Sequence, residues 1–307
     1  MRLSVCITHY NRPERLAATL SSLAEQTRPP DEVLLWDDCS PRDPSNVAAS
    51  FIKKFRSFRY HRNKKNLGMP GNLNAVVCEA SGDLIANLHD ADRFDPRLLE
   101  SWESALVSHP SAGFVFCGTR NEPQSPGERP REFVHSFAPL TSGREFFLQH
   151  YVGSLSSPVW GTVMARQDAY AKLGEFDPRW GPWADVDMWM RMCGRFDVAY
   201  VKQPLLLLDM EVTDWRKFRW RQKLLHDAMV CLNVRRLLGD DPEQMQRCLV
   251  RQRKYLCKRV FRLLIGRAVH RDWRQFSEGI QLGRIVLTAS PFDEVLSRFD
   301  LLAGPSH

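Results

Sequence analysis

Three acidic sites in the chain follow apolar segments of the length of a β-strand. They are Asp37-Asp38, Asp90-Ala91-Asp92 and Asp185-Val186-Asp187. Two carboxylates in the spacing Asp-x-Asp supply oxygen ligands to Mg²⁺ or Mn²⁺, and phosphate oxygens and water complete the shell. One such site alone is compatible with a solvated loop or a helix cap. Three of them together favour a site for a phosphate-bearing ligand, although the chain has no glycine-rich phosphate loop.

The segments around these residues alternate between strand and helix patterns. Apolar runs rich in β-formers predict strands at 3–8, 32–36, 58–62, 83–88, 113–117 and 159–165. Amphipathic patterns predict helices at 13–26, 44–56, 70–80, 96–108, 141–151 and 167–173. Such alternation favours an α/β fold with a mostly parallel central sheet flanked by helices. Ligands of these sheets bind beyond the carboxyl ends of the strands, which is where 8–12, 37–38 and 90–92 fall.

Composition excludes several classes of protein. The chain has 307 residues, 43% of them apolar and 26% charged, which argues against disorder and low-complexity sequence. No run of about 18 apolar residues occurs, so we expect no transmembrane helix. The first residues enter a strand pattern directly, so we expect a cytoplasmic protein without a signal peptide. The eight cysteines are scattered singly, which favours reduced thiols over disulfides or a zinc site.

The positive charge of the chain is concentrated in its last third. Residues from Trp215 onward hold 19 of the 43 Lys and Arg but only 9 of the 36 Asp and Glu. We therefore expect two regions, an α/β domain over 1–212 and a basic helical region over 213–307. The run 247–267 is compatible with a helix packed on the first domain, and also with a peripheral contact to anionic lipid at the inner face of a membrane. It contains no recognised nucleic-acid module, so we expect no nucleic-acid partner.

Ordered motifs over residues 3–210 resemble family 2 glycosyltransferases with the GT-A fold, the fold of nucleotide-diphospho-sugar transferases. Each motif is weak by itself, but their order along the chain is specific. The basic helical C-terminal extension has no such resemblance. The motifs run from the segment 4–13 through Pro30-Asp31-Glu32-Val33, Trp36-Asp37-Asp38, Asn66-Leu67-Gly68, Ser81-Gly82-Asp83, Asp90 with Asp92, and Gly174-Glu175-Phe176-Asp177 to Ala184-Asp185-Val186-Asp187.

The resemblance implies roles for individual residues toward a nucleotide-sugar donor. Tyr10 would stack on the base, Asp38 would accept a hydrogen bond from it, and Arg12 would lie near the diphosphate, to which a guanidinium is suited. Each of the three is also compatible with a purely structural or surface position. The other donor-binding positions are Thr8, Asn66, Gly68, Asn74, Asp90, Gly161 and Asp187.

The resemblance also implies a divalent cation, Mn²⁺ or Mg²⁺, at Asp90 and Asp92. We favour Asp92 as the metal ligand and Asp90 as a contact to the ribose or the metal. The alignment of the motif is ambiguous by one residue, and in the other register Ala91 occupies the principal ligand position. The alternative is therefore a weak metal site, or one that depends on His89.

Asp185 matches the general base of the family, although Ala184 stands where the family has a glutamate. An inverting transfer needs one carboxylate within hydrogen-bond reach of the acceptor hydroxyl. Trp160 and Trp183 flank this segment, and they either stack on an acceptor sugar or belong to the core. Asp187 would point away from Asp185 on a helix and orient the segment or a donor hydroxyl.

The function predicted from these residues is an inverting, metal-dependent transferase. It would move a sugar from a nucleotide sugar, with a UDP-sugar favoured, to a glycan or lipid-linked acceptor, in the synthesis of a cell-surface polysaccharide or another glycan. The alternative is a non-catalytic scaffold that binds a nucleotide sugar or a glycan, which Ala184 and Ala91 favour.

Overall fold

The computed structural model describes residues 1–307 except for 122–130, 155–156, 160, 210–219 and 289–307. Within the described residues, ten strands form one sheet in the order β3-β2-β1-β4-β9-β6-β10-β5, with β7 beside β6 and β8 beside β10. The strands are β1 (Leu3–His9), β2 (Glu32–Asp37), β3 (Phe58–Arg62), β4 (Leu84–His89), β5 (Arg93–Phe94), β6 (Ala112–Asn121), β7 (Glu132–Phe133), β8 (Leu140–Thr141), β9 (Val163–Arg166) and β10 (Asp197–Leu208).

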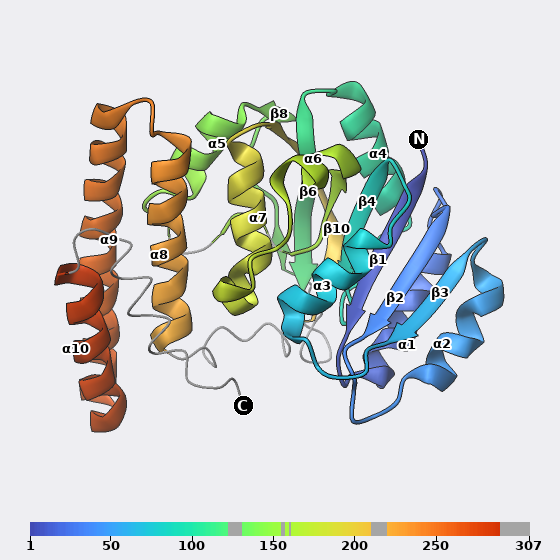
Figure 1. The fold of residues 1–307 in the computed structure, drawn as a ribbon, viewed down its shortest axis with the longest axis horizontal. Coiled ribbons are helices and arrows are strands. Elements are labelled where there is room, and N and C mark those ends of the chain that lie inside the picture. Colours follow the sequence, from blue (N-terminus) through green and yellow to red (C-terminus); the bar gives the residue numbers. More distant parts are fainter. Residues whose placement is uncertain (122–130, 155–156, 160, 210–219, 289–307) are drawn as a thin grey trace.

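Helices connect these strands and cover the sheet (Figure 1). The α-helices are α1 (Pro13–Ala24), α2 (Ser45–Phe51), α3 (Gly68–Cys78), α4 (Leu98–Ser108), α5 (Gly143–His150), α6 (Gln167–Leu173), α7 (Ala184–Cys193), α8 (Trp220–Leu237), α9 (Pro242–Val269) and α10 (Trp273–Thr288). Two 3₁₀ helices, η1 (Ile52–Lys54) and η2 (Pro178–Trp183), complete the set within the described chain. In α1, Pro13 begins the helix, and the residues that face the core are Leu16, Leu20 and Leu23, as their spacing predicts.

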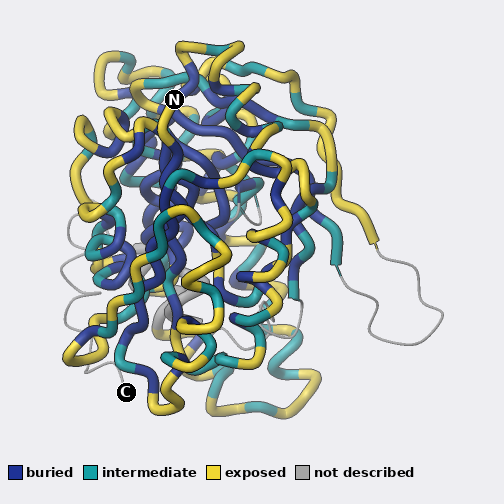
Figure 2. The backbone as a smooth tube through the Cα atoms, turned by 90° about the vertical axis from the view of Figure 1, so that its right-hand side faces the viewer, coloured by how far each residue is buried: buried dark blue, intermediate teal, exposed yellow. Residues whose placement is uncertain are grey.

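Both faces of the central strands are buried. Successive side chains of a strand point to opposite faces, and in β1 the side chain of Cys6 enters one apolar cluster while those of Val5 and Ile7 enter the other. Figure 2 shows the buried segments in the middle of the molecule with exposed segments around them. Helices on both faces are what a largely parallel sheet requires, and they confirm the predicted fold class.

The sheet is largely parallel, as expected, but four of its described strands, β5, β7, β8 and β9, lie antiparallel to their neighbours. β9 lies antiparallel between β4 and β6, and β5 is antiparallel to β10. The alternation of apolar residues fixes which face of a strand is buried, but it carries no information about the direction of the neighbouring strand. Beyond the predicted strand 113–117, β6 extends to Asn121, and the short strand β7 pairs with it.

The C-terminal helices pack on the α/β region. Figure 1 shows α8, α9 and α10 side by side at the end of the molecule opposite β3, with α8 next to α7. Ala228, Val230 and Val234 of α8 are fully buried in the same apolar cluster as α7. The division near residue 212 stays a prediction, because it lies outside the described residues. No helix in the described part of the chain is both long and apolar enough to cross a membrane.

Candidate active site

The carboxyl ends of β1, β2 and β4 meet at one edge of the sheet. Thr8 is level with Trp36 on one side and with His89 on the other. A cavity of about 460 Å³ opens at this edge. Its lining includes eleven of the predicted site residues, namely Thr8, Tyr10, Arg12, Asp38, Asn66, Gly68, Asp90, Asp92, Gly161, Trp183 and Asp185. The topology therefore gathers residues that lie as far apart in the chain as 8 and 185.

Asp38 is held in place by its neighbours at one end of the cavity. Its Oδ1 accepts hydrogen bonds from Asn63 Nδ2 at 3.0 Å and from the backbone N–H of Leu67 at 2.7 Å. Asn63 is itself fixed, because its Nδ2 also donates to Asn72 Oδ1 at 2.9 Å. The side chain of Asp38 is thus oriented before any ligand binds. Tyr10, 45% exposed, lies at the same cavity and presents an aromatic ring to solvent.

Asp90 is buried, and three groups of this chain surround its carboxylate. His9 Nδ1 lies 2.7 Å from Oδ2, the backbone N–H of Tyr10 donates to Oδ2 at 3.2 Å, and Arg12 Nη1 donates to Oδ1 at 3.1 Å. Burial would raise the pKa of Asp90, but the contact with His9 and the charge of Arg12 outweigh it and lower the pKa below its usual value. Asp90 is therefore a carboxylate that positions Arg12.

Asp92 is buried on the other side of the turn. Its Oδ2 accepts a hydrogen bond from the Thr162 hydroxyl at 3.3 Å and lies 3.7 Å from His89 Nδ1. Burial raises the pKa of Asp92 to about 6, against the opposing influence of His89. Its carboxylate is thus partnered by side chains from β4 and from the residue before β9.

Asp185 lies in the first turn of α7, whose residues are all buried except Arg191. Its Oδ1 accepts a hydrogen bond from the backbone N–H of Val186 at 2.7 Å. Burial raises its pKa, and the proximity of His89 opposes this rise. A carboxylate with a raised pKa is suited to accept a proton near neutral pH.

Gly161 allows His89 and Asp185 to approach each other. A Cβ atom on residue 161 would lie 2.3 Å from His89 Nε2 and 2.4 Å from Asp185 Oδ2. Any side chain at this position would therefore displace both groups. His89 Nδ1 lies 3.7 Å from Asp92 Oδ2, and His89 Nε2 borders the same space beside Gly161 as Asp185 Oδ2.

Two predicted donor-binding residues do not line the cavity. Asn74 exchanges two hydrogen bonds with the backbone of Phe176, at 2.8 and 2.9 Å, and so fixes the segment before η2. Asp187 is fully buried, with Arg191 Nε at 2.8 Å and Asn233 Nδ2 at 2.9 Å. Both polar groups are satisfied within the protein, and the contacts of Asp187 agree with the predicted alternative that it orients the segment, while the donor contacts stay predictions.

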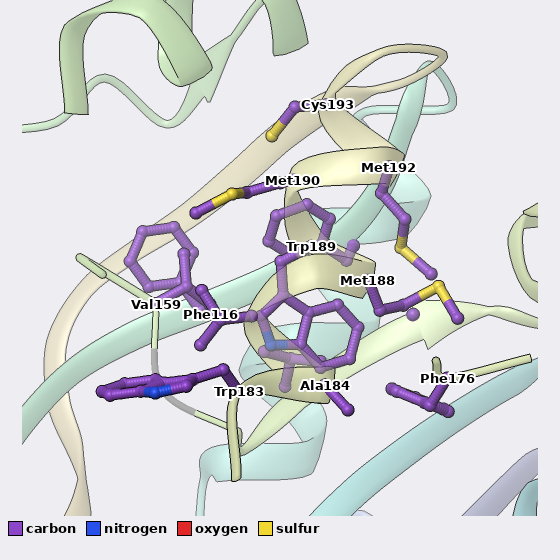
Figure 3. Close-up of a cluster of buried hydrophobic side chains, with 14 of the residues drawn as sticks. Phe116, Val159, Phe176, Trp183, Ala184, Met188, Trp189, Met190, Met192 and Cys193 are labelled. Atoms are coloured by element: carbon purple, nitrogen blue, oxygen red, sulfur yellow. The ribbon is translucent and has the colours of Figure 1, made fainter. Parts of the chain in front are cut away.

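The tryptophans differ in their surroundings. Trp183 lines the cavity with 5% of its surface exposed, and its ring lies 5.0 Å from that of His226 in α8. Figure 3 shows Trp189 in the middle of the apolar cluster, with Trp183 and Phe176 on opposite sides of it. Trp160 lies outside the described residues.

The predicted metal pair does not fit a divalent cation held by carboxylates. The oxygens of Asp90 are already in contact with His9, Tyr10 and Arg12. Ala91 lines the cavity between the two aspartates and offers no ligand atom. In the described part of the chain, no three His, Cys, Asp or Glu side chains gather in a group that could hold a metal ion. A cation at this pair would therefore depend on Asp92 and on oxygens that do not belong to these side chains.

Sequence reasoning missed the residues that hold the acidic side chains. His9 lies in the motif segment 4–13 but was given no role, and Asn63 and Thr162 belong to no motif. Asn233 contacts Asp187 from a helix 46 residues further along the chain. Only His89 carried a signal, because it stands directly before Asp90.

A largely parallel sheet with an acidic cavity at the carboxyl edge of β1, β2 and β4 is the architecture of GT-A glycosyltransferases. The chain belongs to glycosyl transferase family 2, whose model matches residues 4–174. It is 26% identical to the putative glycosyltransferase EpsE of Bacillus subtilis over 195 residues, which are 62% of this chain and 66% of EpsE. An uncharacterised protein of Mycobacterium tuberculosis is 28% identical over 211 residues, which are 66% of this chain and 65% of that protein. The chain thus matches about two thirds of the length of these relatives.

Two solved structures share the fold over nearly the whole chain. S. aureus TarS 1–349 in complex with UDP has a TM-score of 0.64 and 14% identity, and the match covers 100% of this chain and 93% of TarS 1–349. The mannosyltransferase PcManGT from Pyrobaculum calidifontis, in complex with GDP-Man and Mn²⁺, has a TM-score of 0.59 and 14% identity, covering 98% of this chain and 80% of PcManGT. At these identities the likeness establishes the fold.

Proposed function

We propose that the protein transfers a sugar from a nucleoside-diphosphate sugar to an acceptor hydroxyl, with inversion at the anomeric carbon. The observation that carries this proposal is a buried carboxylate of raised pKa, Asp185, in the same cavity as the preorganised Asp38. A UDP-sugar is the favoured donor, since a structure of S. aureus TarS that shares this fold contains UDP-GlcNAc. Asp38 and Tyr10 then meet the base, and Arg12 meets the diphosphate.

The proposed chemistry needs one proton acceptor and one leaving group. Asp185 takes the proton of the acceptor hydroxyl while that oxygen forms its bond to the anomeric carbon. The bond between the anomeric carbon and the diphosphate breaks on the opposite face, and its electron pair leaves with the nucleoside diphosphate. Asp38 binds the donor equally in the ground and transition states, so its part is affinity and not rate.

Trp183 forms part of the cavity wall near Asp185, and we propose that its small exposed part contacts an acceptor sugar. Aromatic side chains are suited to contact the apolar parts of a sugar ring. The acceptor is then a glycan or a lipid-linked glycan of a surface polysaccharide. A Trp183→Ala variant should raise KM for the acceptor while leaving donor affinity near that of the parent protein.

The outer face of α9 favours a lipid surface for such an acceptor. Phe261, Ile265 and Val269 are 65%, 48% and 72% exposed and follow each other at a spacing of four residues. Lys254, Lys258 and Arg262 are exposed on the same helix. Exposed apolar side chains flanked by basic ones favour the interface of an anionic bilayer.

Vesicle binding tests this contact. The protein should sediment with phosphatidylglycerol vesicles and not with phosphatidylcholine vesicles. The double variant Phe261→Ser with Val269→Ser loses two exposed apolar side chains. Its partitioning into these vesicles should be about tenfold weaker than that of the parent protein. The matched control is Val107→Ser on α4, where an exposed valine lies outside this face. Equal loss in the control variant would contradict a role for α9.

The transferase proposal itself is tested by binding and by donor turnover. A thermal-shift series with UDP, GDP, dTDP and CDP identifies the nucleotide, because a ligand at about a hundred times its Kd adds roughly 2.7 kcal/mol of stability. Release of that nucleoside diphosphate from the matching sugar donor, slow without acceptor, would support the enzyme. Tight nucleotide binding without turnover of any donor would favour the scaffold with Ala184 in place of a glutamate.

A further inference from the structure

Three carboxylates that line the cavity, those of Asp90, Asp92 and Asp185, are already in contact with other groups of this chain. Asp90 contacts His9 and Arg12, and Asp92 contacts Thr162 and His89. Asp185 Oδ2 and His89 Nε2 both border the space beside Gly161. A divalent cation shared by Asp90 and Asp92 would have to displace His9 or Arg12 from Asp90.

A cationic side chain is held at the same place. The guanidinium of Arg12 donates to Asp90 Oδ1 at 3.1 Å, yet 41% of the side chain is exposed and lines the cavity. A guanidinium has five N–H donors in a fixed plane, so one bond to Asp90 leaves others for a phosphate. The contact of His9 with Asp90 at 2.7 Å fixes the carboxylate that orients Arg12.

We infer that Arg12, positioned by Asp90 and His9, neutralises the donor diphosphate in place of a divalent cation, so that the nucleotide binds without metal. The inference rests on the proposed function, since it concerns the diphosphate of the nucleotide sugar. It assigns Asp90 the role of orienting a protein cation. It also explains why Ala91, a residue without a ligand atom, is compatible with the site.

The test is titration calorimetry of UDP against the full-length protein, once in EDTA and once with Mn²⁺. We expect the two Kd values to agree within about threefold. Arg12→Gln should weaken UDP binding in EDTA by about 10- to 100-fold, the effect of losing a hydrogen bond to a charged group. Arg12 is partly exposed, so the variant should fold, which its melting temperature checks.

A second variant asks whether the site can be made to depend on metal. Ala91→Asp adds a carboxylate at the cavity wall and should make UDP binding at least about tenfold tighter with Mn²⁺ than in EDTA. Ala91→Asn has the same size without the charge, and it should show no preference for Mn²⁺.

Three outcomes separate the inference from the proposed function. UDP binding by the parent protein that tightens tenfold or more with Mn²⁺ would overturn the inference and leave the proposed function intact. Unchanged UDP affinity of Arg12→Gln in EDTA would overturn the role of Arg12 alone. If none of UDP, GDP, dTDP and CDP binds, either in EDTA or with Mn²⁺, both the donor proposal and the inference are wrong.

Discussion

Asp185→Asn is the variant that most directly tests the catalytic proposal. A positioned carboxylate base contributes about 10²- to 10⁴-fold to the rate, which is about 2.7–5.4 kcal/mol of the barrier. Asparagine keeps the size of the side chain and an oxygen that accepts the N–H of Val186, which Asp185 accepts at 2.7 Å. It has no basic oxygen for a proton. We therefore expect kcat to fall at least about 10²-fold with nucleotide affinity near that of the parent protein.

The structure predicts that the same variant gains stability. Burial raises the pKa of Asp185, which means that the fold disfavours its charged form relative to the unfolded chain. For such an acid the fold loses stability as the pH rises from the ordinary pKa to the raised one, because the unfolded chain releases its proton first. Asparagine removes the charge, so the melting temperature at pH 7 should rise or stay equal. Lost activity together with unchanged or higher stability distinguishes a catalytic base from a structural residue.

Asp187→Asn is the matched control, because it makes the same chemical change two residues away. Asp187 is fully buried and paired with Arg191 at 2.8 Å, and removing one charge of a buried pair costs about 3 kcal/mol. This variant should melt at a lower temperature but keep most of its kcat per folded molecule. Nucleoside-diphosphate release at saturating donor and acceptor measures both variants. Transfer by Asp185→Asn within a few-fold of the parent protein would refute the assignment of the base.

Three further outcomes follow from particular contacts. Asp38→Ala removes an oriented hydrogen-bond acceptor for the nucleotide base, so Kd and KM for the donor should rise about tenfold with kcat nearly unchanged. A collapse of kcat at unchanged donor affinity would contradict this role of Asp38. Gly161→Ala puts a Cβ within 2.4 Å of Asp185 and His89 and should lower kcat about 10²-fold. Its control is Gly266→Ala, where a Cβ has no neighbour within 4 Å. This control should stabilise the helix by about 0.5–1 kcal/mol and leave kcat unchanged. His226 is fully buried against Trp183, and burial, aided by the charge of Arg259, lowers its pKa to about 3. Below about pH 6.5 this histidine binds a proton in the unfolded chain but not in the folded protein. Near pH 5 it therefore lowers the free energy of unfolding by about 2 kcal/mol. Unfolding midpoints of His226→Phe in urea should therefore fall less between pH 7 and 5 than those of the parent protein, and parallel curves would exclude a buried neutral histidine.

The sequence alone predicted β1, β2 and β4, the helices between them and the edge at which these strands meet, but not β5 or β10. The periods of apolar residues are local properties, and the carboxyl ends of parallel strands meet at one edge whatever lies between them. Asp38, Asp90 and Asp185 were therefore predicted together although they lie far apart in the chain. Their family roles came from the resemblance, since spacing by itself does not distinguish a base from a helix cap.

The tertiary structure decided the direction of β9 and the partners of each acidic side chain. Asp187 and Asp185 differ little in local sequence, yet Asp187 is paired with Arg191 and hydrogen-bonded to Asn233, whereas Asp185 lines the cavity. Asp90 contacts Arg12 and also His9, which is 81 residues earlier in the chain. These outcomes depend on contacts between distant segments. The groups that pack against a carboxylate set its pKa and decide which of its oxygens remain available to a ligand, and no local pattern encodes those groups.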